Sequence, residues 1–289
     1  MGFPAELKLK KHETFSIREG WLEKALHYIN ENPRCLSKDQ GTRVFGLGSN
    51  MVKSLRYWLK AAGIATYERN DVKLTELGEQ LLKYDPYLDD DFSLWMIHIH
   101  LVMNYNEAPV FNRFFNNEDK RYEKAYLVKL LEEEFERHNL PVKALSSLDS
   151  DVSVLFKSYY SDDSSSPENN MNCPLARLEL LSANKGTYTK LNPSYASLDC
   201  RVVYQALVLY WKNTHHEGKV SLNIEDMLKD EDNPARMLNI TRSTLFVYLD
   251  ELNRLGYINL AKTAGLNTVY IDKVKGLNEL FKSHFEEGR

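Results

Sequence analysis

The alternation of apolar and polar residues along this chain predicts a mainly α protein that also contains small β-hairpins. Its clearest element is a helix over residues 48–62, because side chains that advance by about 100° per residue separate there into two faces. The apolar face carries Met51, Leu55, Trp58, Leu59 and Ala62. The opposite, basic face carries Ser49, Lys53, Arg56, Tyr57 and Lys60.

A short hairpin is predicted directly after this helix. Residues 64–75 form two strand-like runs around a turn at residues 70–71, which lies between Arg69 and Lys73. A basic helix followed by a basic hairpin is typical of a winged helix that contacts DNA. The alternative is a small helical domain whose basic face only contacts solvent.

The flanking segments fit the same kind of domain. An apolar stripe predicts a helix over residues 16–32 with Ser16 as its cap, and residues 36–48 suggest a short helix between two turns. Thr75 is the expected cap of a further helix over residues 76–83. Residues 1–88 are therefore predicted to form an N-terminal winged-helix module.

The rest of the chain divides into a helical middle region and a second module. Residues 89–181 have a helical pattern, with a mobile loop predicted near residues 161–172 from a run rich in Ser, Asp and Pro. In residues 182–289, Thr241 caps a long helix that Gly256 ends, and a second hairpin follows. This C-terminal module is also winged-helix-like. The mixed charges on its long helix favour a structural or dimerising role.

The charge distribution changes the functional picture more than the composition does. The 289 residues are 43% hydrophobic and 27% charged, as in an ordinary globular protein. Residues 1–84 carry 14 Lys and Arg against 10 Asp and Glu, although the whole chain has a net charge of −4. Since phosphate contacts supply most non-specific affinity, double-stranded DNA is expected to bind the N-terminal module.

The sequence gives no sign of a membrane or secreted protein. No apolar run approaches the roughly 20 residues that span a bilayer, and the N-terminus lacks a signal-peptide pattern. The three cysteines are too widely spaced for a disulfide framework or a zinc motif. A cytoplasmic location with reduced thiols is the prediction, and no membrane partner is expected.

One N-terminal cluster contains residue types that catalyse reactions. His12 and Glu13 are suited to general acid–base work, and Arg18 is suited to holding a phosphate. The alternative is a polar arm anchored by Phe15 and Trp21. No metal site is assigned, because His98 and His100 diverge by about 200° on a helix and the acidic run at residues 85–91 lies at a helix start.

Several blocks of the sequence match a family pattern in order. The N-terminal blocks are His12-Glu-Thr-Phe15 with Arg18 and 20–22, 46–52 with Arg56-Tyr-Trp58, and Leu77-Gly78 with 85–88. Further blocks follow in order: Leu94-Trp95 with His98, Asp151-Val152, Pro174-Leu175 and 263–266. Together these blocks resemble a bacterial, SspB-like family labelled as a domain of unknown function and found beside DNA phosphorothioation genes, and the resemblance covers nearly the whole chain.

The resemblance implies a DNA-nicking role, in which one strand is opened so that sulfur can replace a non-bridging phosphate oxygen. His12, Glu13 and Arg18 are then the catalytic candidates, as reactive residue types in a matching block, and Mg²⁺ is the expected cofactor if the protein is a nuclease. The carboxylates form no obvious metal-binding set, which leaves the use of a metal open.

The leading hypothesis is a DNA-binding component of a phosphorothioation defence system. Lys53, Arg56, Lys60, Arg69 and Lys73 are the expected phosphate contacts. Ser49, Asn50 and Tyr57 are expected closest to the base edges. A non-catalytic adaptor that recruits sulfur-transfer enzymes through its acidic C-terminal half is one alternative, and a winged-helix transcriptional regulator is another. Other phosphorothioation proteins are the expected partners, and a homodimer remains open.

Overall fold

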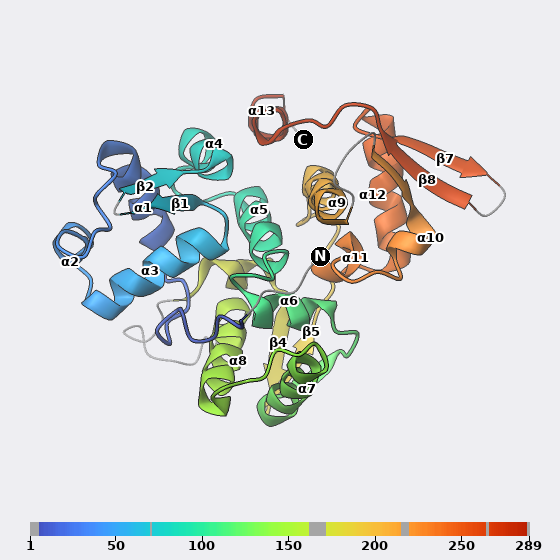
Figure 1. Cartoon of the computed structure of the whole chain (residues 1–289). Helices are drawn as coiled ribbons and strands as arrows, with labels where there is room; N and C mark the ends of the chain where they lie inside the picture. The colour runs from blue at the N-terminus through green and yellow to red at the C-terminus, as the bar shows by residue number, and fades with distance from the viewer. Residues whose placement is uncertain (1–5, 70, 162–171, 215–219, 264–265, 288–289) are drawn as a thin grey trace.

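The chain folds into a mainly α structure with three small antiparallel sheets (Figure 1). This computed structural model describes residues 6–69, 71–161, 172–214, 220–263 and 266–287. The loop predicted to be mobile near residues 161–172 lies outside the described residues except for its two end positions, 161 and 172. Within the described part, no helix has both the length and the apolar character needed to cross a membrane.

The N-terminal part has the element order predicted from the sequence. Its elements are α1 (Trp21–Glu31), α2 (Gly41–Phe45), α3 (Ser49–Ala61), β1 (Ala65–Glu68), β2 (Asp71–Leu74) and α4 (Glu76–Tyr84). Strands β1 and β2 pair in register from Ala65 opposite Leu74 to Glu68 opposite Asp71. The side chain of Thr75 caps α4, as expected, by accepting a hydrogen bond from the Gly78 amide at 3.2 Å.

The predicted start of the first helix at residue 16 is wrong. Helix α1 begins at Trp21, because Gly20 precedes it with a left-handed φ of 77° that a helix cannot continue through. Residues 16–20 instead belong to an irregular segment that follows Phe15, whose carbonyl oxygen accepts a hydrogen bond from Trp58 of α3. The apolar stripe of Trp21, Leu22 and Ala25 is buried as the spacing predicts.

The middle region is built around a helix that is buried on nearly all sides. Ten of the twelve residues of α5 (Asp91–Val102) are buried, and this helix lies near the centre of the molecule (Figure 1). The helices around it are α6 (Pro109–Asn116), α7 (Lys124–Arg137), α8 (Leu145–Tyr159) and the short 3₁₀ helix η1 (Pro174–Leu178).

A three-stranded sheet completes the middle region. Strand β5 (Thr187–Lys190) lies between β3 (Arg121–Glu123) and β4 (Leu181–Asn184), and both pairings are antiparallel. The helical pattern predicted for residues 89–181 therefore ends with η1 at Leu178. Pairing with β5 draws Leu181 into a strand, which local periodicity does not reveal.

The C-terminal part combines a buried helix with a second hairpin. Its elements are α9 (Cys200–Thr214), β6 (Val220–Asn223), α10 (Ile224–Met227), α11 (Pro234–Met237), α12 (Arg242–Arg254), β7 (Asn259–Thr263), β8 (Leu266–Ile271) and α13 (Leu277–Phe285). Thr241 caps α12 by accepting a hydrogen bond from the Thr244 amide at 3.1 Å, as predicted. Strand β8 pairs with both β6 and β7, so the hairpin is part of a three-stranded sheet.

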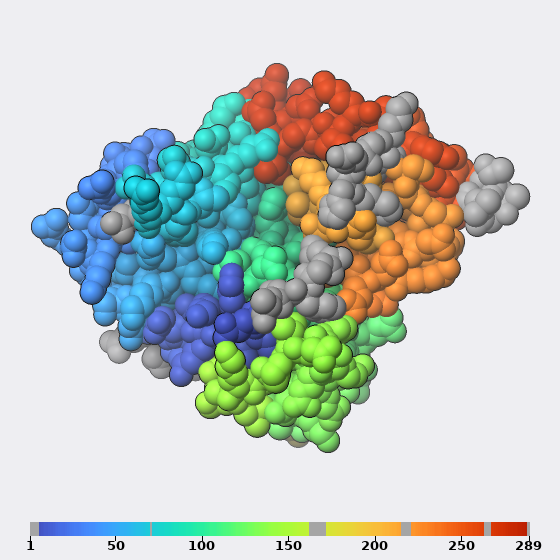
Figure 2. Space-filling model, viewed as in Figure 1, coloured from blue at the N-terminus to red at the C-terminus, as the bar shows by residue number. Residues whose placement is uncertain are grey.

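Helix α13 packs back onto α4 and the start of α5. The amide of Leu277, at the start of α13, donates to Glu76 Oε1 at 3.1 Å. The ring of Tyr84 stacks on Phe285 at 5.8 Å, and Phe92 lies edge-on to Phe281 at 5.1 Å. In the space-filling view the C-terminal residues, in red, meet the cyan residues around α4 at the top of the molecule (Figure 2).

Candidate functional site

The N-terminal segment that contains the catalytic candidates lies against the predicted DNA-binding helix. Ser54 Oγ and Trp58 Nε1, both on α3, donate to the carbonyl oxygen of Phe15 at 3.4 and 3.0 Å. The ring of His12 stacks on the indole of Trp58 with their centroids 5.9 Å apart. Two blocks that are separate in the sequence therefore form one site, with the dark-blue segment next to α3 in Figure 1.

His12 is held on both sides of its ring. It is 1% exposed, its Nε2 lies 2.8 Å from Asp151 Oδ1, and its Nδ1 accepts a hydrogen bond from the Thr14 amide at 3.2 Å. Because Nδ1 is an acceptor, Nε2 carries the proton and donates it to Asp151. Nε2 thus joins the segment to α8, and Nδ1 holds the turn within the segment, so both ring nitrogens are used inside the protein.

The backbone around His12 is unusual. Lys10, Glu13 and Thr14 have left-handed φ angles of 58°, 51° and 74°. A non-glycine residue in this region carries strain, and such residues cluster at functional sites when the surrounding structure enforces them. Here the enforcing contacts are the Asp151 carboxylate, which also accepts the Lys10 amide at 2.9 Å, and the rings packed around His12.

The other two catalytic candidates point in different directions. Glu13 is partly exposed, and its Oε1 lies 3.8 Å from Nζ of Lys53 on α3. The Arg18 guanidinium instead lies over the rings of Phe15 and Trp21, at 5.2 and 5.7 Å. The structure thus places Glu13 beside the basic face of α3, and it places Arg18 on aromatic rings.

Most of the predicted DNA contacts lie on the surface. Ser49, Asn50, Lys53 and Lys60 of α3 are exposed, as are Arg69 and Lys73 of the hairpin. Among the described residues, nothing lies within 4 Å of where a Cβ would stand on Gly46 or Gly48, so the N-terminus of α3 is open. The first amides of α3, which have no side-chain cap, therefore face solvent together with exposed polar side chains.

Arg56 and Tyr57 are turned into the protein. Arg56 Nη1 donates to the Leu36 carbonyl oxygen at 2.6 Å, and its guanidinium lies 4.5 Å from the Tyr67 ring centroid. The Tyr57 hydroxyl donates to the Glu107 carbonyl oxygen at 3.1 Å, and burial raises the pKa of this phenol well above its usual value. A helical wheel places both residues on the outer face, but it cannot show the loops that cover them.

Glu107 also balances part of the basic face. Its carboxylate pairs with Lys60 at 2.9 Å and with Lys8. Partial burial opposes ionisation of this carboxyl, but hydrogen bonds from the two lysines lower its pKa. Lys60 is therefore a weaker candidate for a phosphate contact than Lys53, whose nearest carboxylate is 3.8 Å away.

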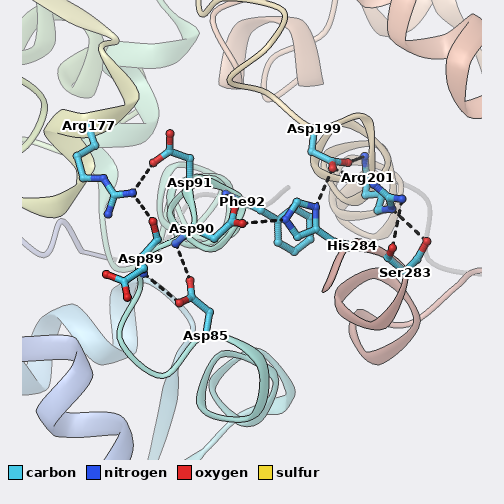
Figure 3. Close-up of polar contacts among 10 residues, drawn as sticks. All are labelled: Asp85, Asp89, Asp90, Asp91, Phe92, Arg177, Asp199, Arg201, Ser283 and His284. Carbon is cyan, nitrogen blue, oxygen red and sulfur yellow. Dashed lines mark hydrogen bonds and ion pairs between the residues drawn. The ribbon is translucent and has the colours of Figure 1, made fainter. Parts of the chain in front are cut away.

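A second polar cluster surrounds His284 of α13, in a part of the molecule that contains none of the predicted DNA contacts. His284 Nδ1 lies 2.9 Å from Asp199 Oδ2, and its Nε2 lies 3.3 Å from Asp90 Oδ2 (Figure 3). Burial opposes a charged imidazole, but the hydrogen bonds to Asp199 and Asp90 raise the pKa of His284. These residues, together with Asp91, Arg201 and Glu251, line a cavity of about 230 Å³.

This cavity does not fit a magnesium ion. Carboxylates are the ligands that Mg²⁺ prefers, but the imidazole of His284 stands between Asp90 and Asp199. Asp199 also pairs with Arg201 at 2.8 Å, and Asp91 pairs with Arg177 at 2.7 Å. Each of these three acids thus has a cation of its own from the protein. The cluster joins α5, α9 and α13 instead of forming a set of metal ligands.

The other acidic and histidine motifs have structural explanations that the sequence anticipates. Asp90 caps α5 by accepting the Phe92 amide at 2.9 Å, so the acidic run does mark a helix start. His98 is fully buried, with its nitrogens 2.8 Å from the Tyr159 hydroxyl and 2.9 Å from the Met237 carbonyl oxygen. Burial lowers the pKa of His98 to about 4.

Residues 9–285 match a family model described as "Protein of unknown function (DUF4007)". The chain belongs to this family. The resemblance carried by the sequence blocks is therefore confirmed, and it extends over nearly the whole chain. A search of the curated proteins by sequence found no match.

Two solved structures share the fold of this DUF4007 chain. One is titled "Magnesium ion-bound SspB crystal structure", with a TM-score of 0.85, and the other "SspB crystal structure", with a TM-score of 0.83. Each is 22% identical in sequence, and each match covers 99% of this chain and 89% of the other. The likeness establishes a shared SspB-like fold.

Sequence reasoning missed several residues of the DUF4007 chain that bear on the candidate site. Lys38 and Arg43 lie near α2 and are exposed, and within the described residues neither has an ion-pair partner. The sequence identifies Asp151 only as part of a matching block, and it does not reveal that Asp151 is the partner of His12. Charge at an exposed short helix is a usable signal for Arg43, whereas no local signal links Asp151 to His12.

Proposed function

We propose that this chain is a DNA-binding protein of a bacterial DNA phosphorothioation system. The fold shared with SspB and the family resemblance support the link to phosphorothioation. The observation that supports DNA binding is the exposed basic surface formed by α2, α3 and the β1–β2 hairpin. Phosphates are the natural ligands of such a surface.

In this proposal α1 to α4, with the hairpin, act as a winged helix. Lys53, Arg69 and Lys73 contact phosphates, and Ser49 and Asn50 at the open N-terminus of α3 approach base edges. Arg56 and Tyr57 position α3 through their contacts with Leu36, Tyr67 and Glu107. Lys60 contributes less, because Glu107 already neutralises much of its charge.

Fluorescence anisotropy with a labelled DNA duplex tests this surface. Reversing the charge at three exposed positions, with Lys53→Glu, Arg69→Glu and Lys73→Glu, is expected to weaken binding at least about tenfold. The slope of log affinity against log salt should also fall by about one for each phosphate that the variant no longer neutralises. Lys60 is left intact because its replacement would disturb the pair with Glu107.

A matched control distinguishes the effect of where the reversed charges lie from the effect of the changed net charge. Lys120, Lys129 and Lys157 are exposed lysines of the middle region, and changing all three to Glu alters the net charge equally. This control should bind DNA nearly as well as the unchanged protein. Equal weakening in both triple variants would contradict the assignment of the interface to the N-terminal module.

DNA nicking is a second candidate activity, and the position of Glu13 supports it. The strained segment that carries Glu13 lies against α3, so a carboxylate stands beside the proposed path of the DNA. One of the two SspB structures with this fold contains magnesium, as its title states. No set of metal ligands is assigned to Glu13.

Conversion of a supercoiled plasmid to open circles, with and without Mg²⁺, tests nicking. Glu13→Gln should reduce the rate at least tenfold while DNA binding persists, and Glu19→Gln is the control on an exposed acid of the same segment. A protein that retards DNA but never yields open circles would instead support the adaptor that recruits sulfur-transfer enzymes. Light scattering on the same samples measures whether a homodimer forms.

A further inference from the structure

We propose that Glu134, His138 and Glu231 form a binding site for a divalent transition-metal ion. One ligand atom from each residue lies within 4.8 Å of the other two, and no other group of three or more His, Cys, Asp or Glu residues in the described ranges converges in this way. The site is independent of the DNA interface. It joins the end of α7 to the segment between α10 and α11.

The backbone brings these side chains together. Glu134 lies on the last turn of α7 and His138 is the C-cap residue four positions later, so the two project from the same side of the helix end. Glu231 precedes Asp232, whose amide donates to Asn116 Oδ1 at 2.7 Å. The Asp232 carboxylate in turn accepts from Asn112 and Asn116 of α6, at 2.6 and 2.7 Å. The segment that carries Glu231 is thus anchored to α6.

The charge balance favours an additional cation. Arg113 is 3% exposed, and its Nη1 donates to Glu134 Oε1 at 3.1 Å and to Glu231 Oε2 at 2.8 Å. Asp232 adds a third carboxylate nearby, and its hydrogen bonds come from neutral amides. Two carboxylates contact the guanidinium, and the third acts on it through its charge, so three negative charges stand against one positive charge. A divalent ion would balance the remaining two negative charges.

Arg113 is compatible with a bound metal. Carboxylates that ligate metals are commonly held by hydrogen bonds from an outer shell of residues, which fixes their orientation. Arg113 donates to one named oxygen on each glutamate, and the second oxygen of each carboxylate is the one we assign to the metal. Glu231 is half-exposed, with 52% of its side chain accessible, which gives an ion a path from solvent.

The ligand types select the class of metal. An imidazole nitrogen with two carboxylate oxygens suits Zn²⁺ and similar transition metals, whereas Mg²⁺ and Ca²⁺ prefer oxygen ligands alone. We therefore expect Zn²⁺ to bind much more tightly than Mg²⁺. Water would complete the coordination of the ion.

Calorimetric titration of the full chain with ZnCl₂, after treatment with a chelator, tests this site. Zn²⁺ should bind one high-affinity site, and His138→Gln and Glu231→Gln should each weaken it at least tenfold. His27→Gln and Glu133→Gln are the controls, since they change a histidine of α1 and an exposed neighbour on α7. Zn²⁺ should also raise the melting temperature of the unchanged protein and of both controls, but not of the two site variants.

The titrations can contradict the metal-site proposal in three ways. Absence of Zn²⁺ binding, or equal affinity in the site variants and the controls, would overturn the proposal. Tighter binding of MgCl₂ than of ZnCl₂ would do the same. Glu231 is half-exposed, so Glu231→Gln remains an informative variant even if His138→Gln lowers the folded fraction. Circular dichroism on each variant measures that fraction.

Discussion

His12 and Asp151 are 139 residues apart in the sequence, and a buried hydrogen bond of 2.8 Å joins them. This contact fixes the N-terminal segment between α3 and α8, and it supports the left-handed backbone at Lys10, Glu13 and Thr14. The strained segment can therefore keep its shape next to the basic face of α3 only while α8 holds it.

Removal of the Asp151 carboxylate should destabilise the protein. Asp151→Ala leaves the buried His12 Nε2 proton without its acceptor, which costs about 1–3 kcal/mol, and it also removes the acceptor of the Lys10 amide. Urea denaturation should show a loss of about 2 kcal/mol or more. Asp149→Asn removes only the exposed pair with Lys124, so its effect should stay below about 1 kcal/mol. Similar losses in the two variants would contradict the role given to Asp151.

Gly78 is required by a close approach of backbone segments. A Cβ at this position would collide with the carbonyl oxygen of Ile64 and would lie 3.1 Å from Leu74 Cδ2. We expect Gly78→Ala to lower the free energy of unfolding by about 2–3 kcal/mol, because α4 must move off the hairpin. Gly48 has nothing within 4 Å of the same position, so thermal or urea unfolding of Gly48→Ala should show a loss below about 1 kcal/mol. A neutral Gly78→Ala variant would show that α4 can shift freely.

Acid should destabilise the fold through His98. Burial lowers the pKa of His98 to about 4, whereas an unfolded histidine titrates near 6.5. Between these two values the unfolded chain binds the additional proton, so His98 makes stability decrease by about 1.4 kcal/mol for each pH unit on acidification from 6.5 toward 4. NMR titration of the His98 ring should give a midpoint near 4 in the folded protein. A midpoint near 6.5 would contradict this environment.

His284 should have the opposite pH dependence. Its pKa is raised by Asp199 and Asp90 despite burial, so the folded protein holds this proton more tightly than the unfolded chain does. The resulting stability is fully present below about pH 6.5, and it is lost as pH rises through the raised pKa of the folded state. Urea denaturation at pH 6 and pH 9 should show this loss, and His284→Gln should remove the difference that His284 causes. An unchanged pH dependence in the variant would exclude His284 as its source.

The sequence was sufficient for features that depend on local spacing. The helix at residues 49–61, both hairpins and the caps at Thr75 and Thr241 follow from periodicity and turn chemistry. Strand pairings between distant segments did not follow from local spacing. Strand β3 meets β5 and strand β6 meets β8 only in the folded chain, and neither β3 nor β6 has a strong strand pattern of its own.

The candidate site was predictable to the same extent. Exposure of Ser49, Asn50 and Lys53 follows from the helical wheel of α3. The inward contacts of Arg56 and Tyr57 depend on Leu36 and Glu107, which belong to other segments. Likewise, Glu231 joins Glu134 and His138 only because Asp232 is bound to α6. Tertiary contacts of this kind leave no periodic trace in a single sequence.

The return of α13 onto α4 has a consequence for synthesis of the protein. During translation α4 and α5 are made well before residues 277–285. The ring contacts of Tyr84 and Phe92 with Phe281 and Phe285 therefore cannot form until α13 has been made. Until then the nascent N-terminal half presents an uncovered aromatic surface. Domains often fold one after another as they emerge, but here the aromatic side of α4 and α5 is covered only once residues 277–285 have been made.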